Sequence, residues 1–284
     1  MRIQILAVYE NLDEYCNAAE KDGKMAAELW EKEAVAPYWK TLCQYAPMDL
    51  SDRKPRPITD IKELRKQIAL LKQIDKNALE QEFNRIAEAL PPYDDDPIYV
   101  AIYPLSNSNI TVKEQQNGVI GTSTFGNIMI QVNPFAVDYE KWIPYVFAHE
   151  YHHTIFGAYW YGIHGGELTG QFIEALLTDG EADHFALSFY PDLKPKWLFQ
   201  MTEEEIFKLF EEKYADIVKR TDVDYVTYMF GKKEKQIPWC AGYAVGFFLI
   251  SQYQKINPQI TYQTMLEEKP VSIYEKVEKQ KVVK

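Results

Sequence analysis

The stretch YVFAHEYHHTIFG, residues 145–157, decides the fold, because it is apolar on nearly every side and yet holds three histidines and a glutamate. Pro144 suits the first turn of a helix and Gly157 suits its end, so the pattern predicts one buried helix. His149 and His153 are four residues apart, which places them about 40° apart on one face. Ionisable side chains on a buried helix need partners, and a bound metal ion is one such partner.

The donors on this helix have the spacing of a zinc site. Two neutral imidazoles four residues apart, His149 and His153, suit a tetrahedral zinc ion. Glu150 falls about 60° beyond His153 on the same side. There its carboxylate can take a proton from a water that the metal activates, without binding the metal. A His149/His152 pair would turn Glu150 away, so we assign His152 to packing or to a supporting contact.

A catalytic zinc ion usually has three protein ligands and one open position. The longer histidine motif of the metzincins is excluded, because Phe156 and Tyr159 stand where it needs a glycine and a histidine. The next candidate is the predicted helix over residues 168–190, LTGQFIEALLTDGEADHFALSFY. On that helix Asp179 and Asp183 fall in the centre of the apolar stripe, the side that we expect to be buried.

Two carboxylates on a buried face are costly unless a cation or strong hydrogen-bond donors compensate them. We therefore predict that Asp179 is the third zinc ligand. Asp183 is predicted to accept the free ring N–H of a zinc histidine and so fix its tautomer. Glu181 and Glu174 lie on the opposite side, which the pattern predicts to be solvated. Glu181 stays an alternative ligand if the helix starts or breaks at Gly180.

The rest of the chain predicts a mostly helical α+β protein. Residues 11–45 and 58–90 have helical composition, and Asp60 and Asn77 each precede a glutamate by three residues, the spacing of a helix N-cap. Residues 98–103 and 128–132 are rich in β-branched and aromatic side chains. Asn117-Gly118 and Gly121 are typical of turns between strands. We expect a small antiparallel or mixed sheet over residues 97–133, and helices after Pro134.

Composition narrows the class of partner. The formal net charge is −11 and the pI is about 5.1, so the chain should repel nucleic-acid phosphates and anionic membrane surfaces. Three cysteines without paired spacing predict neither a disulfide framework nor a cysteine zinc site. The N-terminus has no signal-peptide pattern, and the apolar stretch 243–250 is too short to span a membrane. We expect a cytoplasmic protein with no nucleic-acid or membrane partner.

At this point the sequence resembles a family of bacterial predicted Zn-dependent proteases, filed as a domain of unknown function, and more distantly the gluzincin peptidases. The resemblance rests on HEYHH and on DGEADHFA about 25 residues later. It extends to EAVAPYWKTL, GNIMIQVNP and IPWCAGYAVGFFL. The family's second motif, similar to EGLADHFA, places its glutamate on Asp179, its glycine on Gly180 and its aspartate on Asp183. The aspartate at 179 is one methylene shorter than the family's glutamate.

This resemblance implies further parts of the site. Zincin peptidases use an edge strand to pair with the substrate backbone, and Ile128, Ile130 and Val132 form the candidate strand. Tyr243 matches a GY motif of the family, which implies a hydroxyl that donates to the oxyanion of the reaction. His164, in a glycine-rich turn, is a second polar group that can reach a cleft. His184 lies on the flank of its helix and is predicted to be structural.

These observations predict a helical N-terminal region, residues 1–92, followed by a zincin-like domain, residues 93–284. The expected function is hydrolysis of a peptide or protein substrate with Zn²⁺, with His149, His153 and Asp179 as ligands and Glu150 as the base. The alternative is a zinc-binding regulatory or interaction protein that has lost productive catalysis, which the aspartate at 179 motivates. A non-peptidase amide hydrolase is a third option.

Overall fold

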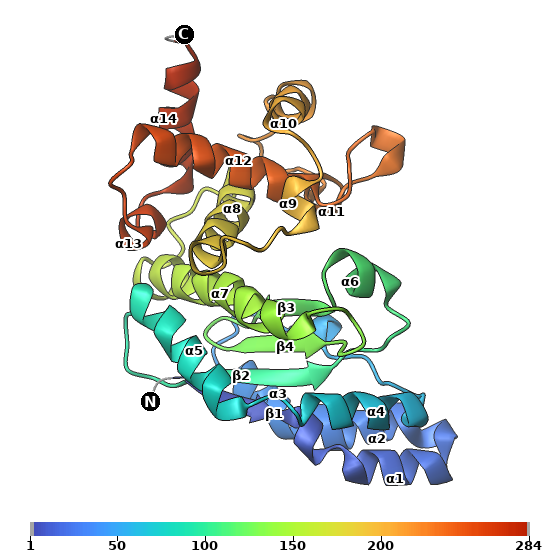
Figure 1. Cartoon of the computed structure of the whole chain (residues 1–284). Coiled ribbons are helices and arrows are strands. Elements are labelled where there is room, and N and C mark those ends of the chain that lie inside the picture. The colour runs from blue at the N-terminus through green and yellow to red at the C-terminus, as the bar shows by residue number, and fades with distance from the viewer. Residues whose placement is uncertain (1–2, 283–284) are drawn as a thin grey trace. The chain divides into compact units, whose positions relative to one another are not determined.

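Figure 1 shows a computed structural model of the chain, which describes residues 3–282. Helices predominate and one small sheet is present, so the predicted α+β class is confirmed. The chain divides into two compact units, Met1–Ile155 and Phe156–Lys284, called unit 1 and unit 2 below. The predicted boundary between residues 92 and 93 instead falls inside unit 1.

The sheet belongs to unit 1 and has the strand order β1-β2-β4-β3. Its strands are β1 (Ile3–Ala7), β2 (Ile98–Pro104), β3 (Val119–Ser123) and β4 (Ile128–Val132). β1 and β4 both pair with β2 in parallel, whereas β3 pairs with β4 antiparallel, so the sheet is mixed. β1 was not predicted. Because β1 completes the sheet, residues 1–92 are not a helical region separate from it.

The strand order corrects two predictions. β4 lies between β2 and β3, so its backbone hydrogen bonds are used on both sides, and Ile128, Ile130 and Val132 are fully buried. The prediction that these residues form an edge strand for substrate is therefore wrong; the edge on this side of the sheet is β3. Gly121 was predicted to be in a turn, but it lies in the middle of β3, opposite Ile130.

The helices of unit 1 cover both faces of the sheet. They are α1 (Asp13–Lys21), α2 (Ala26–Trp30), α3 (Ala36–Leu42), α4 (Ile61–Leu71), α5 (Lys76–Ala89), α6 (Ile110–Gln115) and α7 (Tyr139–Gly157), the last two residues of which begin unit 2. Short 3₁₀ or π segments join them at Val8–Asn11, Gly23–Met25, Glu31–Val35 and Ser51–Arg53.

One face of the sheet packs on the helices from the first third of the chain. Ala101, Tyr103 and Met129 share a buried cluster with side chains of α1 to α4, among them Tyr15 and Trp30. The indole Nε1 of Trp30 donates to the Pro55 carbonyl at 2.8 Å, which satisfies its buried polar atom. This cluster is the core beneath the sheet.

The other face of the sheet lies beneath α7. Gly121 pairs with Ile130, which pairs with Ile102, so these three residues share one face, and a Cβ added to Gly121 would meet Glu150 of α7. α5 packs beside α7 (Figure 1). The rings of Phe83 in α5 and Phe147 in α7 stack at 3.9 Å. The histidine helix is thus held by a sheet and by a neighbouring helix of its own unit.

The predicted helix starts are only partly correct. Asp60 caps α4, since its Oδ1 accepts from the Glu63 N–H at 2.9 Å. α5 is capped by Asp75, whose Oδ1 accepts from the N–H groups of Asn77 and Ala78, and not by Asn77. Asp75 has a side chain equally able to cap, and it lies where the chain leaves the extended conformation.

Unit 2 is helical over the residues that the structure describes. It contains α8 (Phe172–Phe189), α9 (Lys196–Phe199), α10 (Glu203–Leu209), α11 (Tyr225–Phe230), α12 (Ala241–Ile256), α13 (Tyr262–Leu266) and α14 (Pro270–Val282). Shorter 3₁₀ or π segments lie at Ala158–Ile163, Phe210–Tyr214 and Lys233–Lys235. Its core gathers around α8 and α12, with Leu176, Leu177, Val245 and Leu249 fully buried.

Two glycines bring α8 and α12 into backbone contact. A Cβ on Gly180 would overlap the backbone carbonyl of Gly246, and a Cβ on Gly246 would overlap the carbonyl oxygen of Leu176. α8 runs without interruption through Gly180. The glycine therefore serves a close helix crossing and not a helix break, which removes the condition under which Glu181 would be a ligand.

The predicted solvated side of α8 is also corrected. Glu181 is fully buried and Glu174 is 8% exposed. α12, α13 and α14 all pack on α8, and the side that carries Glu174 and Glu181 is covered. Glu174 accepts hydrogen bonds from Thr169 and from the Gly170 N–H at 2.7–2.8 Å, so its carboxylate holds the loop that precedes the helix.

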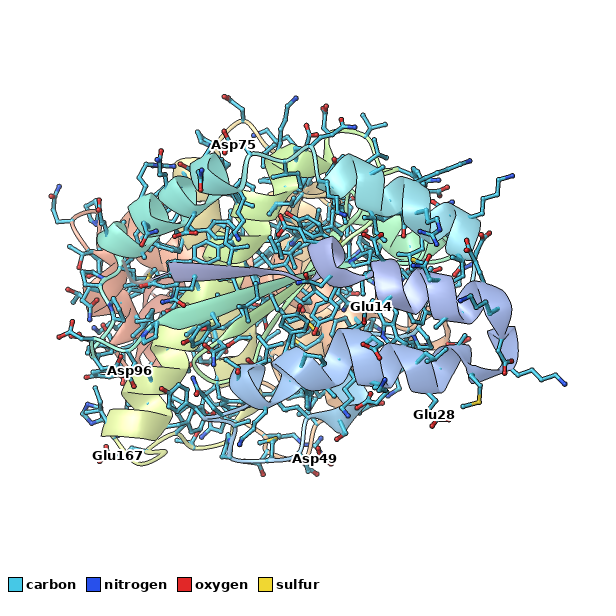
Figure 2. The ribbon with its side chains drawn as sticks, turned by 90° about the horizontal axis from the view of Figure 1, so that it is seen from below. Glu14, Glu28, Asp49, Asp75, Asp96 and Glu167 are labelled. Atoms are coloured by element: carbon cyan, nitrogen blue, oxygen red, sulfur yellow. The ribbon has the colours of Figure 1, made fainter. Side chains whose placement is uncertain are left out.

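Acidic side chains of unit 1 lie at its surface. Glu14 and Glu28 project from α1 and α2, and Asp49, Asp75 and Asp96 are exposed on loops and helix starts (Figure 2). These residues contribute to the net charge of −11. Among the residues described, no helix is long and apolar enough to cross a membrane.

The α8–α12 crossing gives a stability prediction. Gly246→Ala should destabilise the protein by about 3 kcal/mol, because the atoms that the new methyl group meets are backbone atoms of α8 and cannot rotate away. Gly157→Ala is the matched control, since a Cβ there meets nothing within 4 Å. Thermal denaturation of both variants checks the prediction, which an equal melting temperature for the two would contradict.

Candidate metal centre

The face of α7 that carries the donors is the part of the helix left open. Within residues 145–156, His149, Glu150 and His153 are partly exposed, and the other residues are buried. His152 is fully buried. The helical geometry therefore separates the residues as predicted: one histidine lies in the packed interior, and two histidines and the glutamate share an accessible side.

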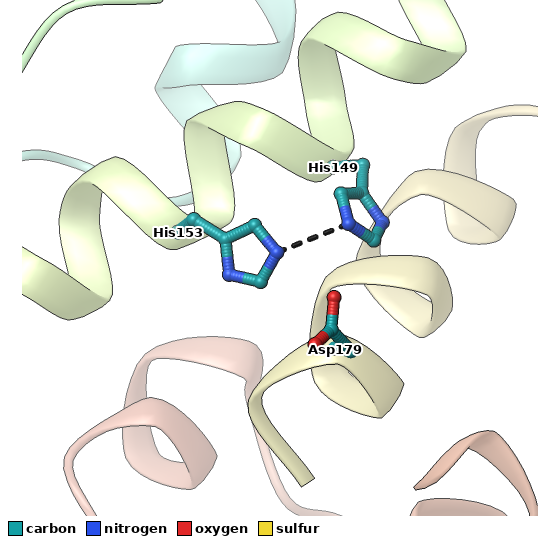
Figure 3. A group of neighbouring side chains, drawn as sticks. All are labelled: His149, His153 and Asp179. Atoms are coloured by element: carbon teal, nitrogen blue, oxygen red, sulfur yellow. Dashed lines mark hydrogen bonds between the residues drawn. The ribbon is translucent and has the colours of Figure 1, made fainter. Parts of the chain in front are cut away.

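The two accessible histidines face each other. Their Nε2 atoms lie 3.0 Å apart, and two neutral imidazoles in this arrangement need either a shared proton or a cation between them. Asp179 joins this group: one ligand atom from each of His149, His153 and Asp179 lies within 4.8 Å of the others. Figure 3 shows the Asp179 carboxylate directed toward the two rings.

The donor set fits a divalent metal ion of the zinc type. Zinc binds imidazole nitrogen and carboxylate oxygen at about 2.0–2.2 Å, so neighbouring donors in a tetrahedral site are about 3.3 Å apart. The separation of 3.0 Å between the two Nε2 atoms is close to that value. Two histidines and one carboxylate also leave one position of a tetrahedron for water or substrate.

Glu150 is held beside the histidines by the edge strand β3. Its Oε2 accepts a hydrogen bond of 2.7 Å from the backbone N–H of Ser123. Thr154, one turn further along α7, lies with its Oγ1 3.0 Å from Ser123 Oγ. These contacts were not predicted from the sequence. A glycine inside a β pattern is the signal that could have found them, since it often marks a close approach of another group.

Asp179 and Asp183 are both buried on α8, as predicted, with Asp179 8% exposed and Asp183 fully buried. Asp183 accepts from the indole Nε1 of Trp197 at 3.2 Å, a partner that the sequence did not indicate. Its predicted bond to a zinc histidine remains a prediction. Burial, with the nearby carboxylates of Asp183 and Asp179, raises the pKa of the Cys240 thiol to about 12.

The structure gives the other candidate residues contacts of their own. Glu181 is not a member of the metal-binding group, and burial, with the nearby Glu268 carboxylate, raises the pKa of Glu181 well above its usual range. His164 packs its ring against Tyr159 at 4.4 Å. Tyr243 lies in the first turn of α12 with its ring 5.9 Å from that of Phe230. Its role as an oxyanion donor remains a prediction.

His184 has a structural environment in unit 2. Its ring stacks on Phe247 at 3.9 Å, and its Nε2 lies 3.0 Å from both the Phe247 carbonyl oxygen and Ser251 Oγ. Burial lowers the pKa of His184 from 6.5 to about 4. These contacts agree with the structural role predicted for it.

The arrangement of two histidines, a nearby glutamate and a carboxylate from a second helix is of the kind found in metal-dependent hydrolases. The chain belongs to the family described as "Predicted Zn-dependent protease (DUF2268)", which matches residues 76–275. This confirms the resemblance stated from HEYHH and DGEADHFA. Comparison with curated proteins and with solved structures gave no match.

The environment of His184 predicts a dependence of stability on pH. The folded state keeps the ring neutral down to a pKa of about 4, whereas the unfolded state takes up a proton near pH 6.5. The free energy of unfolding should therefore fall as the pH drops from 6.5 toward 4. In His184→Gln this slope should be shallower by up to about 1.4 kcal/mol per pH unit. Urea denaturation of both proteins across this range checks it; identical slopes would contradict it.

Proposed function

We propose that this protein is a zinc-dependent peptidase in which His149, His153 and Asp179 hold the metal ion and Glu150 acts as the base. The observation that carries the proposal is that one ligand atom each of His149, His153 and Asp179 lies within 4.8 Å of the others, and that the α7 face with the two histidines also presents Glu150. Membership of the predicted Zn-dependent protease family supports the same chemistry.

Each residue has a separate role in the proposed hydrolysis. A zinc ion held here would polarise the scissile carbonyl and make water a stronger nucleophile at neutral pH. The Glu150 carboxylate would accept the proton of the attacking water and then deliver it to the leaving amine. The Tyr243 hydroxyl would donate to the oxyanion, and Asp183 would orient a ligand histidine by accepting its ring N–H.

In this proposal β3 takes the substrate-binding role that the sequence analysis gave to β4. The hydrogen bonds Thr124 N–H to Asn127 O and Asn133 N–H to Gly118 O stand at the two ends of the β3–β4 ladder. Because such bonds alternate along an antiparallel pair, the backbone groups of Gly121 and Ser123 point outward from the sheet. The Ser123 N–H donates to Glu150, so pairing with a peptide would use the Gly121 N–H and the Ser123 carbonyl. An extended peptide added to this edge would pass the Glu150 carboxylate.

The proposal keeps the expected partners. The substrate is a peptide or protein segment in extended form, and the exposed acidic residues of a chain with net charge −11 disfavour nucleic acid and anionic membranes. The cysteines Cys16, Cys43 and Cys240 are all free, which suits the reducing cytoplasm that we expect as the location.

The aspartate at position 179 favours a second candidate function. Asp179 stands where the resembling family motif has glutamate, and its side chain is one methylene shorter, which calls for a closer approach to the metal or an intervening water. A weaker or catalytically unproductive zinc site would make the protein a zinc-binding regulatory or interaction module. The two functions share the metal site and differ in turnover.

The mechanism predicts a separation of turnover from metal binding. Glu150→Gln keeps the size of the side chain and removes the proton acceptor, so peptide hydrolysis should fall by at least about 100-fold while the metal content stays that of the wild type. The measurements are cleavage of a peptide library and metal analysis of protein purified without added metal. Activity of Glu150→Gln close to that of the wild type would refute the mechanism.

The control variant is His149→Ala, which should lose both metal and activity because one of the three ligands is gone. A chelator should stop the wild-type enzyme, and added Zn²⁺ should restore it. Stoichiometric metal in the wild type without cleavage of any peptide in the library would favour the regulatory module over the peptidase.

A further inference from the structure

The middle of β3 is shaped around the Glu150 side chain. A Cβ on Gly121 would overlap Glu150 Cγ and lie 2.7 Å from Oε1 and 2.8 Å from Cδ. Any residue with a side chain at position 121 would therefore force Glu150 out of its place. Glycine at this position is the residue that leaves room for the carboxylate.

The same strand supplies the hydrogen bond that orients the carboxylate. The Ser123 N–H donates to Glu150 Oε2 at 2.7 Å, the short distance expected of a bond to an ionised acceptor. This N–H belongs to the outward set of β3, so it takes no part in the ladder with β4. The strand therefore offers this donor to Glu150 without losing a sheet hydrogen bond.

β3 is itself fixed in place at its end. Thr124 Oγ1 donates to the Leu42 carbonyl of α3 at 2.6 Å, and Asn127 Nδ2 donates to the Thr41 carbonyl at 3.0 Å. Asn127 Oδ1 accepts the Tyr99 N–H of β2 at 2.8 Å. Thr124 and Asn127 are fully buried. The turn that carries Ser123 is thus tied to two other elements of unit 1.

We propose that Gly121 and the backbone N–H of Ser123 are positioning residues for Glu150: the glycine leaves the space that the side chain occupies, and the N–H fixes the direction of its carboxylate. The inference rests on the proposed function of Glu150 as the base. It assigns to one edge strand both the placement of the proton acceptor, through the Ser123 N–H, and the remaining outward backbone groups for a substrate.

A methyl group at position 121 should lower the catalytic rate and leave the stability of the fold unchanged. The atoms that a methyl group at 121 would meet belong to the Glu150 side chain, which can rotate, and not to backbone. Rotation relieves the overlap at little cost in stability but moves the carboxylate from its place. Misplacement of a catalytic group by about 1 Å can lower the rate by about 100-fold.

The first test is Gly121→Ala against Gly157→Ala. In Gly121→Ala, kcat should fall by about 100-fold, with melting temperature and metal content unchanged. Gly157→Ala adds the same methyl group where nothing lies within 4 Å and should keep wild-type kcat. Wild-type kcat in Gly121→Ala would overturn the proposal, as would a loss of activity explained by unfolding or by loss of metal.

A second test isolates the hydrogen bond. Ser123→Pro removes the outward N–H, which an edge strand tolerates, whereas Ser123→Ala removes only the hydroxyl that contacts Thr154. The proline variant should lose about tenfold more kcat than the alanine variant, the loss expected for one hydrogen bond to a charged group. Equal kcat values for the two would show that the N–H does not position Glu150.

An NMR measurement that does not depend on turnover tests this inference separately from the proposed function. The Ser123 amide proton, followed by NMR in isotopically labelled protein, should shift upfield in Glu150→Ala, and by a similar amount in Gly121→Ala. If the wild type cleaves no peptide, the peptidase proposal fails while this comparison still tests the positioning. An unchanged Ser123 resonance in Gly121→Ala would refute the positioning even in an active enzyme.

Discussion

The contact between β3 and α7 is the constraint on which the arrangement of unit 1 depends. Gly121 and Ser123 are two residues apart on a strand, so both lie on the same face of β3. Glu150 and Thr154 are four residues apart on a helix, so both lie on the same face of α7. These two faces contact each other. Burying the polar face of α7 would add no apolar contacts, because the apolar side chains lie on its other sides. The sheet edge gives that face its partners and leaves the two histidines accessible.

Much of the site was predictable because it depends on local geometry. The spacing of His149, Glu150 and His153 sets their common face in any α-helix, and the buried position of Asp179 followed from the apolar stripe of α8. The predictions that failed depend on contacts distant in sequence. Nothing within residues 128–132 reveals that strands lie on both sides of them, since a buried interior strand and a buried edge strand have the same composition.

The burial of Glu181 has a related explanation. A polar residue opposite an apolar stripe indicates solvent only if no other element covers that side, and α13 and α14 pack on α8 in unit 2. The glycine contact between α8 and α12 determines how α8 lies in that packing, because backbone touches backbone there. The backbone next to Asp179 therefore lies in direct contact with α12 at Gly180.

The pairing of β1 with β2 has a consequence for the order of assembly. It joins residues 3–7 to residues 98–102, and no element between them is a strand, so β1 is synthesised long before its partner exists. Pairing over such a sequence separation has a high cost in loop-closure entropy, and this cost slows folding. The family match begins at residue 76 and leaves β1 outside it. A fragment confined to the matched region would expose one edge of β2, an open template for association with another chain.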